Sequence, residues 1–156
     1  MQKAAFAACL IAAALVTGCK AKPEMTIQQF MAKKVDPTSK VYFDAVSSSS
    51  ELVDGKVVET NKQPQTDAEW EKVRQAAADL QAQGKTLGED YADGRREDWK
   101  KMSSDLVTMG QRAEAAAKSH NPDAVFEAAG NIYLVCDGCH TAYPKDSKTA
   151  SGGSAS

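Results

Sequence analysis

The sequence has few aromatic residues and almost no excess of charge of either sign. Both features limit the classes of function that it can have. Of its 156 residues 6% are aromatic, and 19 basic residues stand against 21 acidic ones for a formal net charge of -2. A nearly balanced charge lacks the basic surface that nucleic-acid binding needs, so no nucleic-acid partner is expected. The sequence also lacks a phosphate-binding loop and a paired nucleophile and base. We therefore predict a protein that is not an enzyme.

The sequence has no apolar run long enough to cross a bilayer comfortably. Its longest run, Ala4 to Val16, holds 13 uncharged residues after the basic Lys3, whereas a spanning helix needs roughly 20. Such a short run, followed by small residues, is typical of a secretory signal peptide. Residues 16–19, Val-Thr-Gly-Cys, resemble the bacterial lipobox, which implies cleavage before Cys19 and acylation of its thiol. Ordinary cleavage that leaves Cys19 as a free thiol is the alternative.

These features predict residues 1–18 as a lipoprotein signal peptide and residues 19–25 as a lipidated N-terminus and tether. Several acyl chains on Cys19 would anchor a soluble domain firmly. One acyl chain gives only marginal membrane binding, whereas two or more give stable anchoring. The residue after Cys19 is not aspartate. In this respect the chain resembles lipoproteins that are sent to the outer membrane. We expect a periplasm-facing protein anchored to a bacterial membrane by this lipid, with the outer membrane slightly favoured.

The rest of the chain has little strand pattern and is predicted to be helical. Apolar residues recur at three- and four-residue steps, as on one face of a helix. The four segments with this pattern begin at Thr26, Thr66, Glu97 and Asn121. They predict an all-α fold, an antiparallel up-down-up-down four-helix bundle over residues 26–146. A disordered tail is expected at residues 147–156.

Prolines, glycines and capping residues predict where these helices break and end. The Asp-Pro pair at Pro37 interrupts the first helix, so we expect a kink or a restart there. Thr66 and Glu69 have the spacing of a capping box, and Gly84 is a natural stop for the second helix. Asn121 is the expected N-cap of the fourth helix, with Pro122 at its first position. The Asp-Gly pair at Gly55 lies between short apolar pieces and predicts a small hairpin or an ordered loop.

Chemistry-bearing residues are concentrated in Cys136-Asp137-Gly138-Cys139-His140, near the end of the fourth predicted helix. This is the C-x-x-C-H pattern of c-type haem attachment. Two thiols about one helical turn apart can each add to one vinyl group of a haem, and the adjacent His140 then lies under the iron. One motif predicts one covalent haem c.

The same two cysteines would also suit a disulfide redox pair or half of a zinc site. A thioredoxin-like pair lies where a strand meets the start of a helix, whereas this pair lies at the end of a helix in a helical chain. A tetrahedral zinc site needs a fourth ligand that the neighbouring sequence does not supply. Haem attachment is therefore the favoured prediction.

The sixth position of the iron decides what such a haem can do. A methionine there gives an electron carrier, whereas an empty position admits small gases. In an up-down-up-down bundle the end of the fourth helix lies beside the starts of the first and third, which places Met31 and Met102 within reach. Met31 is our candidate for the distal ligand. Ordinary core filling is the alternative for both residues, because methionine on a helical stripe usually does that.

The chain resembles the class II c-type cytochromes, which are cytochrome c-prime and its low-spin methionine-ligated relatives. The resemblance rests on an early methionine in the first helix, the attachment motif at the end of a helical chain, and the aromatic Tyr143 just after it. It implies a four-helix cytochrome domain over residues 26–146 with haem attached near the end of the last helix. It also implies His140 as proximal ligand and Met31 as distal ligand, and a homodimer is a further expectation.

The sequence departs from this family in one respect. In the family, a basic residue often follows the motif closely and helps to bind the haem propionates. Here Lys145 is displaced from that position. Arg95 and Arg96, on a loop expected at the haem end, are substitute candidates for contacts with the propionates or with a partner. A solvated pair of loop residues is the alternative, because exposed arginines are common.

The sequence thus predicts a lipid-anchored periplasmic cytochrome that carries single electrons to or from a redox partner in the periplasm or membrane. Phe30, Trp99 and Tyr143 are candidates to line the haem pocket, and Phe30 and Trp99 are equally credible as plain core. One alternative on the same scaffold is a five-coordinate haem protein that binds or scavenges NO or CO. Another, of a different class, is a haem-free helical-bundle lipoprotein with a structural Cys136–Cys139 disulfide that acts as a binding module.

Overall fold

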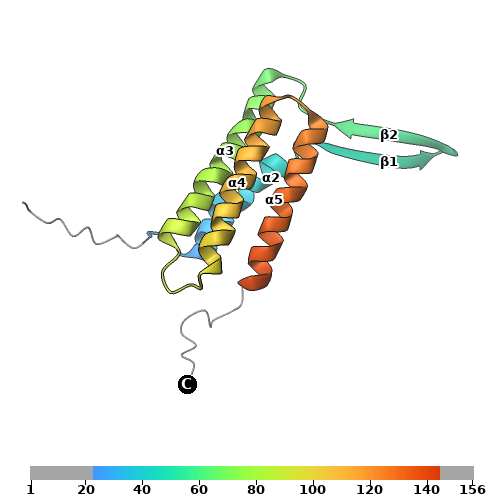
Figure 1. The fold of residues 1–156 in the computed structure, drawn as a ribbon. Helices are drawn as coiled ribbons and strands as arrows, with labels where there is room; N and C mark the ends of the chain where they lie inside the picture. Colours follow the sequence, from blue (N-terminus) through green and yellow to red (C-terminus); the bar gives the residue numbers. More distant parts are fainter. Residues whose placement is uncertain (1–22, 145–156) are drawn as a thin grey trace, which may run out of the picture.

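The computed structural model describes residues 23–144, which are mainly helical. Three long helices run side by side and alternate in direction, namely α3 (Asp67–Asp90), α4 (Asp98–Lys118) and α5 (Pro122–Ala142) (Figure 1). A shorter helical stretch at residues 27–43 packs chiefly against α3, and a two-stranded sheet projects from the bundle. This arrangement is compatible with the predicted four-helix bundle, but the sheet means that the described chain is not wholly α.

The first helical stretch has a wide turn in its middle. It consists of α1 (Ile27–Phe30), the π-helical η1 (Met31–Val35) and α2 (Asp36–Phe43). In η1 the Asp36 N–H donates to the Met31 carbonyl five residues back. Pro37 follows, and because it has no N–H and its ring clashes with the preceding turn, the regular pattern cannot continue through it. The predicted restart at this proline is confirmed.

A hairpin joins the first helical stretch to α3. Strands β1 (Ser47–Val53) and β2 (Lys56–Lys62) pair antiparallel through a two-residue turn. Asp54 and Gly55 both have positive φ, 52° and 75°, which a type I′ turn requires at its two central positions. Of the two sequence expectations for this segment, the hairpin is confirmed and the ordered loop is not.

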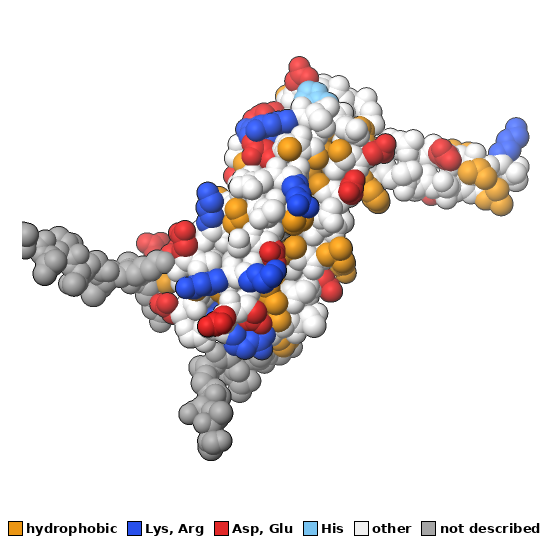
Figure 2. All heavy atoms as spheres, in the orientation of Figure 1, with side chains coloured by type: hydrophobic (Ala, Val, Ile, Leu, Met, Phe, Trp, Pro, Cys, Tyr) orange, Lys and Arg blue, Asp and Glu red, His pale blue; other side chains and the backbone are white. Residues whose placement is uncertain are grey.

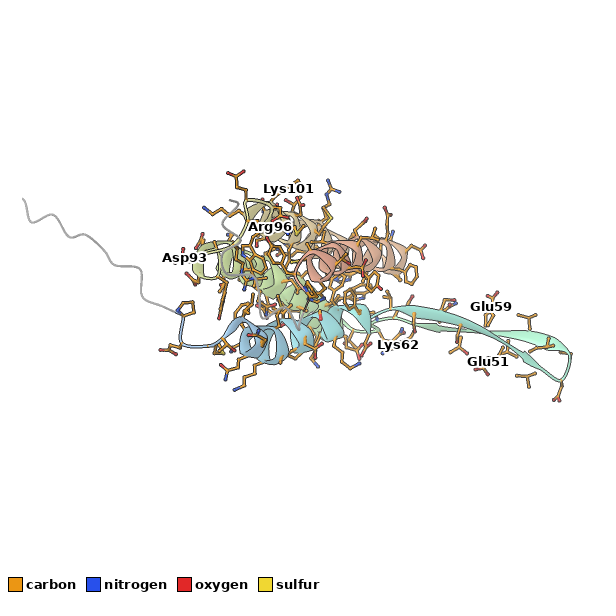
Figure 3. All side chains as sticks on the ribbon, turned by 90° about the horizontal axis from the view of Figure 1, so that it is seen from below. Glu51, Glu59, Lys62, Asp93, Arg96 and Lys101 are labelled. Carbon is orange, nitrogen blue, oxygen red and sulfur yellow. The ribbon has the colours of Figure 1, made fainter. Side chains whose placement is uncertain are left out.

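The hairpin makes no buried contact with the bundle. Every residue of both strands is exposed. Figure 3 shows the hairpin continuing beyond the end of α2, with Glu51, Glu59 and Lys62 projecting from its strands. Its apolar side chains, which Figure 2 shows at the surface, therefore contribute nothing to the core.

Helices α3 and α4 approach each other closely because their contact surface is built from glycine and alanine. A Cβ at Gly84 would lie 2.9 Å from Val107 Cγ2 and 3.1 Å from the Ser103 carbonyl oxygen. A Cβ at Gly110 would lie 2.7 Å from Gln81 Cγ. The prediction that Gly84 ends the second helix is wrong, since α3 continues to Asp90 and Gly84 serves helix packing instead.

The other predicted caps are present. Thr66 and Glu69 form the reciprocal capping box at the start of α3, and Asn121 accepts hydrogen bonds from Asp123 and Ala124 N–H groups with Pro122 in the first turn of α5. The core runs through all the helices. Its most deeply buried large side chains are Tyr42, Leu80, Val125 and Ile132.

Several sequence predictions concern residues outside this description. The signal peptide at 1–18, acylation of Cys19, most of the tether and the tail at 147–156 all lie outside residues 23–144. Within those residues, no helix combines the length and apolar composition that crossing a bilayer requires.

Candidate functional site

The C-x-x-C-H motif occupies the last turns of α5. Cys136 and Cys139 are partly buried and pack against the same hydrophobic core as Ile132. His140 is exposed, and its side chain has no hydrogen-bond or ion-pair partner within residues 23–144. One helical turn separates the two sulfurs, and His140 follows one turn after Cys136. The motif therefore presents two thiols and an imidazole on adjoining lines of one helix.

Both cysteines are free thiols in the structure. Burial raises the pKa of the Cys136 thiol to about 11, and the neighbouring Cys139 adds to this effect. Burial also raises the pKa of Cys139, while the positive charge of Arg95 opposes the rise and Asp98 adds to it. The two sulfurs thus lie in apolar surroundings, with one guanidinium and one carboxylate acting on the second of them.

An aromatic and arginine cluster ties the end of α5 to the loop between α3 and α4. The Trp99 and Tyr143 rings meet edge to face with centroids 4.9 Å apart. Trp99 is almost fully buried, and its Nε1 donates to the Leu87 carbonyl at 2.7 Å. The Arg95 guanidinium lies over the Trp99 ring at 4.2 Å from its centroid. Tyr143, directly after the motif, is therefore held by residues from a distant part of the chain.

Charged groups hold the other side of Tyr143. Its hydroxyl donates to Asp98, and the Arg96 guanidinium lies 4.9 Å from the centre of its ring. Arg96 also pairs with Asp98 at 2.7 Å. Sequence reasoning did not single out Asp98. An acidic residue between the loop arginines and Trp99 is a weak signal, and only the fold brings it to Tyr143.

The start of the first helical stretch reaches the same end of the bundle (Figure 1). The Tyr91 hydroxyl donates to the Met25 carbonyl at 3.0 Å, and the Tyr91 ring packs on Phe30 with centroids 5.3 Å apart. Phe30 is buried and Met31 is partly buried, both against the common core. The end of α5 and the starts of α1 and α4 therefore lie at one end of the bundle, as the bundle topology predicts.

The predicted pocket residues belong to one core but do not all meet the motif directly. Phe30, Met31, Trp99 and Tyr143 pack in the same core cluster as the two cysteines. Met102 is partly buried on α4 and is not among the residues that pack against this core. Ligation of the haem iron by Met31 stays a prediction.

One line of α5 is exposed although its residues are apolar or aromatic. Phe126, Tyr133 and His140 are seven residues apart, so they form a nearly straight row along the helix, which we call the outer row. Phe126 and Tyr133 are 65% and 61% exposed. Figure 2 shows apolar side chains at the surface along α5. The outer row thus adjoins the motif and has a large uncovered apolar surface.

One hollow in the described surface lies away from the motif. Its volume is about 780 Å³, and it is lined by the end of α3, the 91–97 loop and Lys100, with Arg95 and Arg96 among its residues. Neither cysteine nor His140 lines it. Within residues 23–144 no group of three or more His, Cys, Asp or Glu side chains is placed to hold a metal ion.

Comparisons of the chain with protein-family models, with curated proteins and with solved structures gave no match.

Proposed function

We propose that the chain is a c-type cytochrome that carries single electrons. Cys136 and Cys139 would hold one haem by thioether bonds, and His140 would be its proximal ligand. The observation that carries the proposal is a C-x-x-C-H motif whose thiols are free and partly buried, beside an imidazole that has no partner within residues 23–144. When bound, haem supplies one-electron chemistry through its iron.

The residues around the motif fit such a group. A haem is a large apolar ring, and Tyr133 offers uncovered apolar surface two helical turns before His140. Cys136 and Cys139 contact the apolar core against which Met31 also packs. Covering apolar surface stabilises a complex by about 25 cal/mol per Å². Trp99 and Tyr143 hold the end of α5 against the bundle, which fixes the segment on which the two thiols and the imidazole lie.

The sixth position would be taken by Met31, which makes the protein an electron carrier rather than a gas-binding protein. Its partial burial against the core that also contacts Cys136 and Cys139 supports this assignment over Met102. The predicted lipid on Cys19 would keep the domain at a bacterial membrane, where a redox partner would exchange electrons with it.

Mass spectrometry tests haem attachment. The full chain is expressed with a working cytochrome-maturation system, and we expect the processed chain to carry the added mass of one haem. The double variant Cys136→Ala/Cys139→Ala should lose that mass, whereas Asp137→Asn, between them, should keep it. A bare polypeptide in the wild type would defeat the proposal. A mass lower by two hydrogens would then favour the haem-free lipoprotein with a Cys136–Cys139 disulfide.

Optical spectroscopy tests the distal ligand. A sulfur-to-iron charge-transfer band in the oxidised protein, lost in Met31→Ala and kept in Met102→Ala, is the expected result. A high-spin wild-type spectrum that responds to NO or CO would replace electron transfer by the five-coordinate alternative. The same band persisting in Met31→Ala would show that another residue is the ligand.

Cell fractionation tests the membrane anchor separately. The wild-type chain should co-purify with membranes and carry acyl chains at its N-terminus. A Cys19→Ala chain should lose both properties while the domain over residues 26–146 keeps its helical circular dichroism. Release of the wild-type chain as a soluble periplasmic protein would contradict the predicted lipid anchor without affecting the proposed haem site.

A further inference from the structure

Arg95 carries a positive charge that the structure fixes in place without an ion pair. Its Nε donates to the Tyr91 carbonyl at 3.0 Å, and its guanidinium lies over the rings of Trp99 and Tyr143 at 4.2 and 5.6 Å. No carboxylate lies within ion-pair distance of it in the described part of the chain. A cation over an aromatic face is held by the ring quadrupole, so the guanidinium is fixed without an ion pair, while Glu89, Asp93 and Glu97 line the same surface hollow as Arg95.

The neighbouring Arg96 differs in both respects. It is paired with Asp98 at 2.7 Å, and its side chain is 64% exposed. The opposite charge and the surrounding water both weaken its field at a distance. Of the two arginines that the sequence singled out, only Arg95 is partly buried and unpaired within residues 23–144.

The fixed charge lies next to the motif. The Tyr143 N–H donates to the Cys139 carbonyl at 2.8 Å, and the Tyr143 ring meets both Trp99 and Arg95. Arg95 and Asp98 are the charged side chains that act on the Cys139 sulfur. Two short contacts therefore connect the guanidinium to the backbone of the attachment segment.

We infer that Arg95 raises the reduction potential of the haem at Cys136–His140, an inference that rests on the proposed function. The oxidised iron carries one more positive charge than the reduced iron, so a nearby fixed cation disfavours the oxidised state. Asp98 acts in the opposite sense, because its carboxylate favours the oxidised state. The cluster thus does more than hold Tyr143, since it also sets the charge beside the iron.

Potentiometric titration of the haem-loaded chain tests this. Arg95→Gln should lower the potential, with the equilibrium constant for reduction falling on the order of tenfold, as expected for one unit charge about 10 Å away at an effective dielectric constant of about 20. Arg95→Lys should keep most of the potential because it keeps the charge. Asp98→Asn should raise it. Arg112→Gln makes the same charge change, but Arg112 lies 13 residues beyond Trp99 on α4, about 20 Å along the helix, so this variant should leave the potential unchanged.

The outcomes separate this inference from the proposed function. If the wild type contains no covalent haem, both fall together. If haem is attached and Arg95→Gln leaves the potential unchanged, or shifts it no more than Arg112→Gln, only the role of Arg95 is overturned. The optical spectrum must stay that of the wild type in each variant, and a shift in Arg95→Lys as large as in Arg95→Gln would show that packing, not charge, controls the potential.

Discussion

Helices α3 and α4 bury the surfaces that they present to each other, whereas the outer row of α5 is exposed to solvent. Gly84 and Gly110 bring α3 and α4 so close that a methyl group at either position would overlap its neighbours. On α5, a Cβ at Gly130 would have nothing within 4 Å, and Phe126 and Tyr133 face solvent. One surface is shaped for contact with another helix, and the other has exposed apolar side chains on the helix that carries the motif at Cys136–His140.

This difference separates a surface that stabilises the bundle from one that does not. Helices in direct contact gain from small residues that let their backbones approach and pack densely. Large exposed apolar side chains such as Phe126 and Tyr133 contribute nothing to that packing. The predictions below test this contrast, from the largest expected effect to the smallest.

The first prediction compares how removing a buried and an exposed side chain changes the free energy of unfolding. Leu80→Ala, in the fully buried core of α3, should lower the free energy of unfolding by about 2 to 5 kcal/mol, because it removes apolar contacts and leaves a cavity. Tyr133→Ala should change it by about 0.5 kcal/mol or less when no haem is bound. Urea denaturation of both haem-free variants measures this. Equal losses would show that the outer row is part of the core.

The second compares glycines in matched helix positions. Gly110→Ala should destabilise the protein by about 1 to 3 kcal/mol, because the new Cβ would meet Gln81 and the α3 backbone. Gly130→Ala should instead stabilise it by up to about 1 kcal/mol through helix propensity alone. Thermal unfolding of the two variants and the wild type measures whether each substitution stabilises or destabilises the protein. A stabilising Gly110→Ala would contradict the close approach of α3 and α4.

The third concerns the clamp at the end of α5. Tyr143→Phe keeps the ring contact with Trp99 but removes the hydrogen bond to Asp98. A hydrogen bond to a charged group contributes about 1.5 to 3 kcal/mol when well shielded and less near water, so a loss of about 1 kcal/mol is expected. Hydrogen exchange at the last turn of α5 should accelerate more than exchange in α3. Uniform acceleration would argue against a local clamp.

The fourth concerns the polar margin of the α3–α4 contact. Glu114 accepts hydrogen bonds from Lys118 on its own helix and from Gln81 and Arg74 on α3, and these partners lower its pKa from 4.5 to about 2. A lowered pKa contributes stability above pH 4.5 that is lost as the pH falls toward 2. The contribution should be about 1 kcal/mol or less, because the pair is partly solvated.

Glu114→Gln checks this through the pH dependence of unfolding. The wild type should lose stability between pH 4.5 and 2 more steeply than the variant. Glu127→Gln, on the exposed side of α5, is the matched control and should follow the wild type. Identical pH profiles for wild type and Glu114→Gln would remove the α3–α4 network as a source of acid sensitivity.

Features that depend on only a few neighbouring residues can be predicted from the sequence. The caps at Thr66 and Asn121 and the restart at Pro37 depend on hydrogen bonds within one turn, and all three are present. Gly84 was misread because glycine has two uses in helices. It stops a helix when it takes a left-handed conformation, and it permits close packing when another helix crosses it. Only the partner α4 tells these uses apart.

The candidate site divides in the same way. The two cysteines and His140 were identified from their spacing alone, and their places at the end of a helix followed from its apolar pattern. The pairing of Arg95 with Trp99 and of Asp98 with Tyr143 was not foreseen. Asp98 and Tyr143 are 45 positions apart in the chain, so no local pattern predicts their contact. Arg95 and Trp99 are only four residues apart, but the Tyr143 ring that completes the cluster comes from the distant end of α5.

By itself, the sequence determined the helix caps, the turn of the hairpin and the spacing of Cys136, Cys139 and His140 near one helix end, because each depends on short-range covalent spacing. Tertiary structure alone decided which glycines lie at a contact, which apolar row of α5 stays uncovered, and which of two neighbouring arginines keeps an unpaired charge. Those outcomes depend on what another helix places within a few ångströms, and packing, not spacing, settles that distance.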